Sequence, residues 1–253
     1  FNGAVNFLSG KLEDGATQAT AQTARLFLGL QVQCTQCHNH PFNEWKQNQF
    51  WQLTSFFRQT AALRRFEPGT RNVRFIELTD EDFAGEDRPS DPEQARVYYE
   101  LRNGRLEAAF PVFVDGTAIA TSGLVREVNR RQKLADLIVQ SPDLPRALVN
   151  RLWAHFLGFG FTRPVDDMGP HNPATYPELL EYVAEQFQQN SFDVKQLISW
   201  IVLSEPYARS SVTTRQNASD DPLLSQAPRF SHFYVRQMTP EQLYRSLLVA
   251  SQG

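Results

Sequence analysis

The chain has 253 residues, of which 41% are hydrophobic and 21% are charged, and its formal net charge is −3. This balance is typical of a globular protein with one or two domains and argues against disorder. The charge and the lack of a dense Lys/Arg run argue against nucleic acid as a partner, and no apolar run is long enough for a transmembrane segment. The chain opens at Phe1 without a signal segment, so we expect a mature form or an excised fragment.

Two predicted helices lie on either side of a pair of cysteines. Good helix formers over residues 17–32 predict a helix that runs into this pair. Pro41 interrupts the chain after it. An apolar stripe that includes Phe50 and Leu53 then predicts a second helix over residues 44–60.

The next stretch, to about residue 121, carries the predicted β structure. Residues 72–78 alternate in polarity and are rich in β-branched residues, which predicts a strand. Asn103 and Gly104 separate two further strand candidates, residues 96–102 and 105–114. Both central residues tolerate a positive φ, so we predict a hairpin with a type I′ turn.

The remaining segments are predicted to be helical. Their periodicity and capping signals cover residues 129–139, 143–156, 175–189, 193–203 and the stretch from 239 onward. Thr175 and Thr239 each begin a predicted capping box, and Asp193 is a predicted N-cap. We therefore expect a mainly α chain with a small antiparallel β element (α+β), divided into regions 1–122 and 123–253.

The only two cysteines form a CxxCH motif, Cys34-Thr35-Gln36-Cys37-His38. Two thiols three residues apart can bond to the two vinyl groups of one haem edge, and the next imidazole can then bind the iron. Such motifs usually lie at a helix end, where we place this one. The motif therefore predicts covalent haem c at Cys34 and Cys37, with His38 as the proximal ligand.

Three other interpretations of the cysteine pair stay open. The thiols could form a disulfide or a thioredoxin-like redox pair, although that fold places its motif after a strand. Zinc could be held by Cys34 and Cys37 together with two of His38, His40 and a distant histidine, although a second ligand pair at a recognisable spacing is missing. The pair could also be reduced and without a ligand.

The second axial ligand of a haem iron is less well defined by the sequence. His155, on a predicted helix, and Met168, in a predicted loop, are the candidates, and methionine would raise the reduction potential. We do not expect His40 to reach the opposite face of a ring bound by His38, because only one residue separates them. Met238 is expected to serve packing, and an open sixth position is a further alternative.

Asp166 and Asp167 are adjacent acids in a loop bounded by proline and glycine. Such acids can bind calcium or act as acid and base. More often they cap a helix or pair with arginine, which is the interpretation we favour here.

Three segments resemble planctomycete cytochrome-associated domains of the PSCyt type followed by the PSD type. They are residues 27–42 (FLGLQVQCTQCHNHPF) with Trp45, residues 147–158 (ALVNRLWAHFLG) and residues 164–169 (PVDDMG). The resemblance implies domains of uncharacterised function in large exported proteins that often carry an additional cytochrome-like domain. It makes Cys34, Cys37 and His38 candidate haem residues, and His155, Asp166 and Asp167 motif positions of unknown role.

The leading hypothesis is a mono-haem c-type protein that transfers electrons outside the cytoplasm to a redox partner protein. One alternative is an exported enzyme acting on extracellular polymers, with Asp166, Asp167 and His155 as its polar centre. The other is a cell-surface interaction module in which Cys34 and Cys37 form a disulfide or hold zinc.

Overall fold

The computed structural model describes residues 3–224 and 227–251. The chain is about 42% helical and has two small antiparallel sheets, which confirms the mainly α, α+β class. It divides into two compact units, one formed by residues up to 148 with 166–173, the other by 149–165 with the chain from 174 onward. The expected boundary after residue 122 stays a prediction. Among the described residues, no helix has both the length and the apolar character that crossing a membrane requires.

Small side chains bring two helices of the first unit into close contact. The helices of this unit are α1 (Val5–Ser9), α2 (Thr17–Phe27), α3 (Gln47–Thr54), α4 (Arg130–Gln140) and the first part of α5 (Asp143–Leu157). Ala19 and Ala24 of α2 are fully buried, and so is Phe50 of α3. Thr20 and Thr54 are buried and joined by a hydroxyl–hydroxyl hydrogen bond of 2.9 Å. The hydroxyls of Thr20 and Thr54 are therefore paired where α2 meets α3.

The first helix is shorter than its sequence predicts. It ends at Phe27, and Gly29 takes a left-handed conformation with φ +67°. The backbone N–H groups of Leu28 and Leu30 both donate to the carbonyl of Ala24, which closes the last turn. The prediction of a helix up to residue 32 is wrong because a glycine that can adopt a positive φ ends the helix early.

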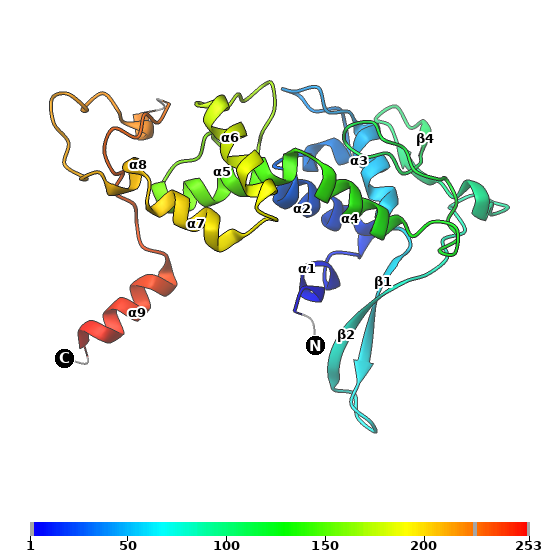
Figure 1. Cartoon of the computed structure of the whole chain (residues 1–253). Helices are drawn as coiled ribbons and strands as arrows, with labels where there is room; N and C mark the ends of the chain where they lie inside the picture. Colours follow the sequence, from blue (N-terminus) through cyan, green and yellow to red (C-terminus); the bar gives the residue numbers. More distant parts are fainter. Residues whose placement is uncertain (1–2, 225–226, 252–253) are drawn as a thin grey trace. The chain divides into compact units, whose positions relative to one another are not determined.

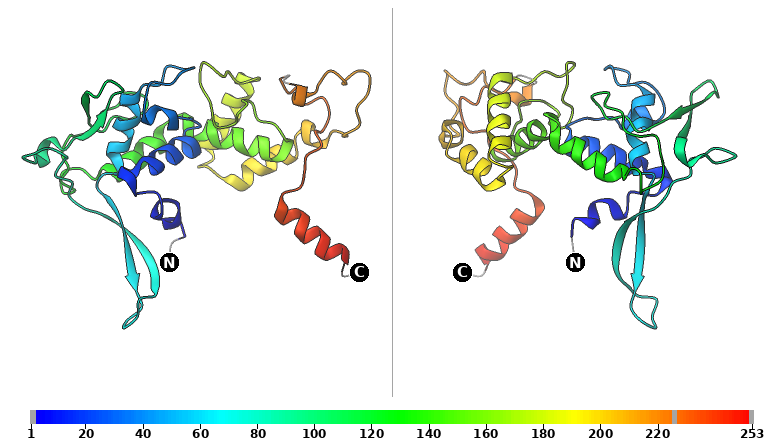
Figure 2. Two further views of the ribbon diagram at one scale, coloured as in Figure 1. Left: turned by 180° about the vertical axis from the view of Figure 1, so that it is seen from behind. Right: turned by 45° about the vertical axis from the view of Figure 1, so that its right-hand side comes forward.

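A long hairpin, which the sequence predicted only in part, follows α3. Strands β1 (Thr60–Phe66) and β2 (Val73–Asp80) pair in antiparallel register, and α1 contacts β2. Strand β2 confirms the strand predicted at 72–78. The helix predicted over 44–60 instead ends at Thr54 and passes through a 3-10 turn, Ser55–Phe57, into β1. The far half of the hairpin projects away from the helices of its unit (Figure 1; Figure 2).

The second predicted hairpin is confirmed, with shorter strands and a different turn. Strands β3 (Val97–Glu100) and β4 (Leu106–Ala109) pair in antiparallel register. Gly104 has φ +82°, whereas Asn103 does not have a positive φ, so the type I′ prediction is wrong. Leu101 donates to the carbonyl of Arg105 and accepts from the N–H of Gly104, the pattern of a three-residue loop with a glycine bulge.

A fully buried arginine ties the irregular segments of the first unit to α4. The guanidinium of Arg130 donates to four backbone carbonyls, those of Ser55, Ala95, Thr121 and Ser122, at 2.7–3.2 Å. Its backbone N–H donates to the side chain of Gln59, which is also buried. Burial lowers the pKa of Arg130 to about 10, so the side chain stays charged at neutral pH.

The second unit is a group of helices. It contains the end of α5, then α6 (Pro177–Gln189), α7 (Val194–Val202), α8 (Glu205–Ala208) and α9 (Pro240–Ser251). Of these, α7 and α9 have a side-chain cap at the N-terminus. The caps predicted at Asp193 and Thr239 are confirmed, because Asp193 accepts from the Gln196 N–H and Thr239 exchanges two hydrogen bonds with Gln242. The box predicted at Thr175 is wrong, because Tyr176 is the N-cap and makes no side-chain capping bond.

A buried aspartate organises the long segment between α8 and α9. Asp220 is 3% exposed and accepts four hydrogen bonds. The donors are the N–H of Arg229 at 2.9 Å, the N–H of Ser231 at 2.9 Å, the hydroxyl of Ser231 at 2.6 Å and the phenol of Tyr234 at 2.6 Å. Burial alone would raise the pKa of Asp220, but these hydrogen bonds outweigh it and lower the pKa to about 2.

Candidate functional site

The CxxCH motif lies on a short 3-10 turn, Gln33–Gln36, instead of at a helix end. Cys34 and Cys37 are both exposed and carry free thiols. Thr35 between them is fully buried, and its hydroxyl donates to the carbonyl of Val32 at 2.6 Å. The turn therefore directs one polar side chain inward and leaves both sulfur atoms accessible.

Helix α3 fixes the backbone of this turn. The carbonyl of Gln36 accepts one hydrogen bond from the side chain of Gln47 at 3.2 Å and one from the indole of Trp51 at 3.0 Å. Gln47 also donates to the carbonyl of Glu100 at 3.0 Å. Trp51 stacks on Tyr99 of β3, with ring centroids 5.9 Å apart and an interplanar angle of 8°. The peptide between the two cysteines is thus tied to both α3 and β3.

The imidazole of His38 has one nitrogen engaged by the backbone. Its Nδ1 lies 2.6 Å from the carbonyl oxygen of the next residue, Asn39. A carbonyl can only accept, so we assign the proton to Nδ1. The lone pair of Nε2 is then the one that can bind a metal, which is the arrangement usual for metal-ligating histidines.

His40 has a structural role in the loop that follows. Its Nδ1 accepts from the backbone N–H groups of Phe42 and Asn43, both at 3.2 Å. Phe42 itself is 86% exposed. An aromatic side chain that is left in solvent five residues after the second cysteine is available to cover a ligand.

The two candidates for a distal ligand lie in different units. Met168 belongs to the first unit, and its N–H donates to the carbonyl of Gly29 at 2.8 Å. Its Sδ packs so closely on Gly29 that a Cβ there would approach to 2.7 Å. His155 belongs to the second unit, where it is exposed on α5. Its ring lies edge-on to that of Phe156, with the ring centroids 5.0 Å apart. Both assignments stay predictions.

The adjacent acids of the first unit are engaged in separate pairs. Asp166 is buried, pairs with Arg25 and accepts from the side chain of Gln31 at 2.8 Å. Burial raises its pKa, but these two partners outweigh burial and hold the pKa below its ordinary value. Asp167 lies 2.9 Å from Nε2 of His171. The favoured interpretation, pairing with arginine, thus describes Asp166.

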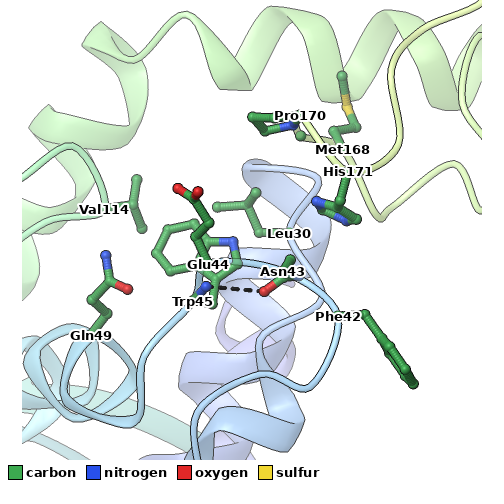
Figure 3. Close-up of a pocket in the computed structure, with 11 residues that line it drawn as sticks. Leu30, Phe42, Asn43, Glu44, Trp45, Gln49, Val114, Met168, Pro170 and His171 are labelled. Atoms are coloured by element: carbon green, nitrogen blue, oxygen red, sulfur yellow. Dashed lines mark hydrogen bonds between the residues drawn. The ribbon is translucent and has the colours of Figure 1, made fainter.

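A cleft beside this loop was not predicted from the sequence. It has a volume of about 590 Å³, and Figure 3 shows the side chains around it. They are Leu30, Phe42, Asn43, Glu44, Trp45, Gln49, Val114, Met168, Gly169, Pro170 and His171. The sequence holds no signal for this site, because its walls come from four separate parts of the chain that only the fold brings together.

The described residues contain no group of three or more His, Cys, Asp or Glu side chains that could hold a metal ion. This finding gives no support to the zinc and calcium alternatives. The residues of the CxxCH motif do fit a haem c: the two thiols are free and exposed, and Nε2 of His38 is available as a ligand.

The comparisons with known families agree with the resemblance of the sequence. Residues 7–62 match the PSCyt2 family, described as a protein of unknown function (DUF1549), and residues 130–253 match the PSD1 family, described as a protein of unknown function (DUF1553). No curated protein and no solved structure matches the chain significantly.

Proposed function

Since this chain belongs to the PSCyt2 and PSD1 families, whose function is unknown, we propose that it is a mono-haem c-type protein that transfers single electrons to a redox partner protein. Bacteria attach haem c outside the cytoplasm, so the proposal includes an extracytoplasmic location. Covalently bound haem would supply a one-electron iron couple. The observation that carries the proposal is the state of the motif: two exposed free thiols next to a histidine whose Nδ1 is engaged.

Each part of the turn has a function in this proposal. Cys34 and Cys37 would form the two thioether bonds, and His38 would bind the iron through Nε2. The carbonyl of Asn39 holds Nδ1 and thereby fixes the tautomer and the orientation of the ring. The hydrogen bond from Nδ1 to this carbonyl also makes the imidazole a more basic ligand.

The surroundings of the turn would orient the haem and limit its contact with water. The bonds from Gln47 and Trp51 to the carbonyl of Gln36 hold the thiol-bearing backbone in place. Phe42 supplies an exposed aromatic surface close to the motif in sequence. Apolar cover around a haem raises its reduction potential, because it disfavours the more highly charged oxidised iron. His155 or Met168 would be the distal ligand.

Intact-mass spectrometry tests the attachment. We expect the chain, matured in a bacterial host that attaches haem to an established c-type protein, to gain about 616 Da, the mass of one haem. Cys34→Ser together with Cys37→Ser should abolish the gain, and the chain has no other cysteine that could replace them. An unchanged mass in this host would refute the proposal. A loss of about 2 Da would indicate a disulfide instead.

The role of His38 is tested separately by absorbance spectroscopy. His38→Ala should keep the thioethers but shift the Soret band, because the iron loses its proximal imidazole. The matched control is His171→Ala, a histidine of the same unit that pairs with Asp167. A Soret band that shifts equally in both variants would contradict the assignment of His38.

A further inference from the structure

The cleft of the first unit is a candidate site for a small molecule, separate from the CxxCH motif. Its volume of about 590 Å³ lies within the range of roughly 300–1,000 Å³ that is usual for small-molecule sites. Cys34, Cys37 and His38 are not among its described lining residues. The cleft is formed by residues 42–49, by the segment 168–171, and by Leu30 and Val114 (Figure 3).

The charge of the cleft is negative and lacks a countercharge. Glu44 is exposed, and no ion pair or hydrogen bond to its carboxylate is found within the described part of the chain. No Lys or Arg is among the described lining residues, and the one histidine, His171, already contacts Asp167. A cleft with one uncompensated carboxylate attracts a cation from solution.

The walls of the cleft indicate which kind of cation fits. Trp45 and Phe42 are aromatic, and Leu30, Val114 and Met168 are apolar. A metal ion would need several convergent ligands, and the described residues hold no such group. Organic ammonium ions, by contrast, bind to the faces of aromatic rings, tryptophan being the strongest partner.

We propose that this cleft binds a small organic ammonium ion, with Trp45 as the aromatic platform and Glu44 as the countercharge. The carboxylate of Glu44 and the ring of Trp45 lie in the same part of the cleft, between Val114 and Leu30 (Figure 3). The apolar wall accommodates the alkyl groups of the ion. The cleft shares no residue with the CxxCH motif, while Phe42 and Met168 belong both to its wall and to the proposed surroundings of the haem.

The test is an NMR titration of the full chain, in the form that mass spectrometry identifies, with choline as the probe. The four tryptophans give four indole N–H signals, and Trp45→Phe identifies the one from Trp45. We expect the Trp45 signal to shift and saturate with a dissociation constant in the millimolar range, while that of Trp200 stays in place. The neutral analogue of choline has a tert-butyl group in place of trimethylammonium, and its dissociation constant should be at least about fivefold higher than that of choline.

A substitution in the cleft separates charge recognition from general apolar binding. Glu44→Gln should weaken choline binding about fivefold. Glu13→Gln removes the same charge from an exposed position of the same unit outside the cleft, and should leave the affinity unchanged. The proposal is overturned if the neutral analogue binds as well as choline, if Glu44→Gln binds like the wild type, or if no saturable shift occurs up to about 100 mM.

Discussion

Arg130 in the first unit and Asp220 in the second have similar structural roles but opposite charges. Each is almost fully buried and organises segments without regular structure by bonding to backbone groups. Arg130 donates to four carbonyls, whereas Asp220 accepts from two N–H groups and two hydroxyls. Neither depends on an ion pair in the described residues closer than the 3.9 Å between Asp220 and His232. Backbone dipoles can thus replace a counterion around a buried charge.

The two buried charges differ in how they respond to pH. The guanidinium stays protonated at neutral and acidic pH, since its pKa is about 10. The carboxylate can be neutralised by acid. The contribution of Arg130 should therefore depend on geometry alone, and that of Asp220 on geometry and on pH.

The largest effect is expected for Arg130→Met, which keeps the bulk of the side chain and removes all its donors. Four carbonyls would lose a buried partner, and the free energy of opening of the first unit should fall by about 3–5 kcal/mol. Hydrogen exchange of peptides from α3 and α4 measures this loss locally.

The matched control for this change is Arg131→Met on the same helix. Arg131 pairs with Asp80 near the surface, so its loss should lower the same free energy by about 1 kcal/mol or less. Equal effects of the two substitutions would contradict the structural role assigned to Arg130.

Asp220→Asn should have the next largest effect. The amide keeps the shape of the side chain, but its NH₂ group can only donate. It would stand in place of a carboxylate oxygen that accepts hydrogen bonds from N–H and O–H donors. We expect the free energy of opening around residues 229–234 to fall by about 2–3 kcal/mol, measured by hydrogen exchange of those amides. Asp221→Asn is the control: its Oδ1 caps the N–H of Leu223 in an exposed turn, and asparagine keeps that acceptor. Unchanged protection in Asp220→Asn would contradict the role of Asp220.

The acid response of the second unit should be the smallest of the three effects. The pKa of Asp220 is about 2 in the folded chain, below its ordinary value of 3.8. The folded state therefore holds the charged form more strongly, and this stability is present above about pH 4 and lost as the pH falls towards 2. The loss amounts to about 2 kcal/mol.

Urea unfolding at several pH values between 5 and 2 measures this loss, followed through the fluorescence of a variant in which Trp153 of the second unit is the only tryptophan. Asp220→Asn should flatten the acid decline relative to the wild type, because the variant has no carboxylate to protonate at this position. Parallel declines in the two proteins would assign the acid sensitivity to other groups.

Features fixed by neighbouring residues were predictable from the sequence, and features fixed by distant ones were not. The caps at Asp193 and Thr239 act within three residues, and both form as predicted. Strand β1 was missed because its second half, with Arg64 and Arg65, is exposed and lacks a clear alternation.

The same distinction applies to the candidate site. The haem chemistry proposed for the CxxCH motif could be inferred from the sequence, since its residues are adjacent in the chain. The bonds that position it come from Gln47 and Trp51, and those around Arg130 come from carbonyls as many as 75 residues away. No local pattern encodes such partners, because they depend on how the segments pack.

The carbonyl of Gln36 has a consequence for any group that bonds to the two sulfur atoms. It accepts two hydrogen bonds, so both of its lone pairs are used before such a group arrives. The two hydrogen bonds fix the orientation of this peptide dipole, so it does not reorient when a new charge is placed beside it. With the proposed haem attached, the polypeptide between the thiols should consequently relax little when the charge of the iron changes, and rearrangement of this stretch would not limit the proposed electron transfer.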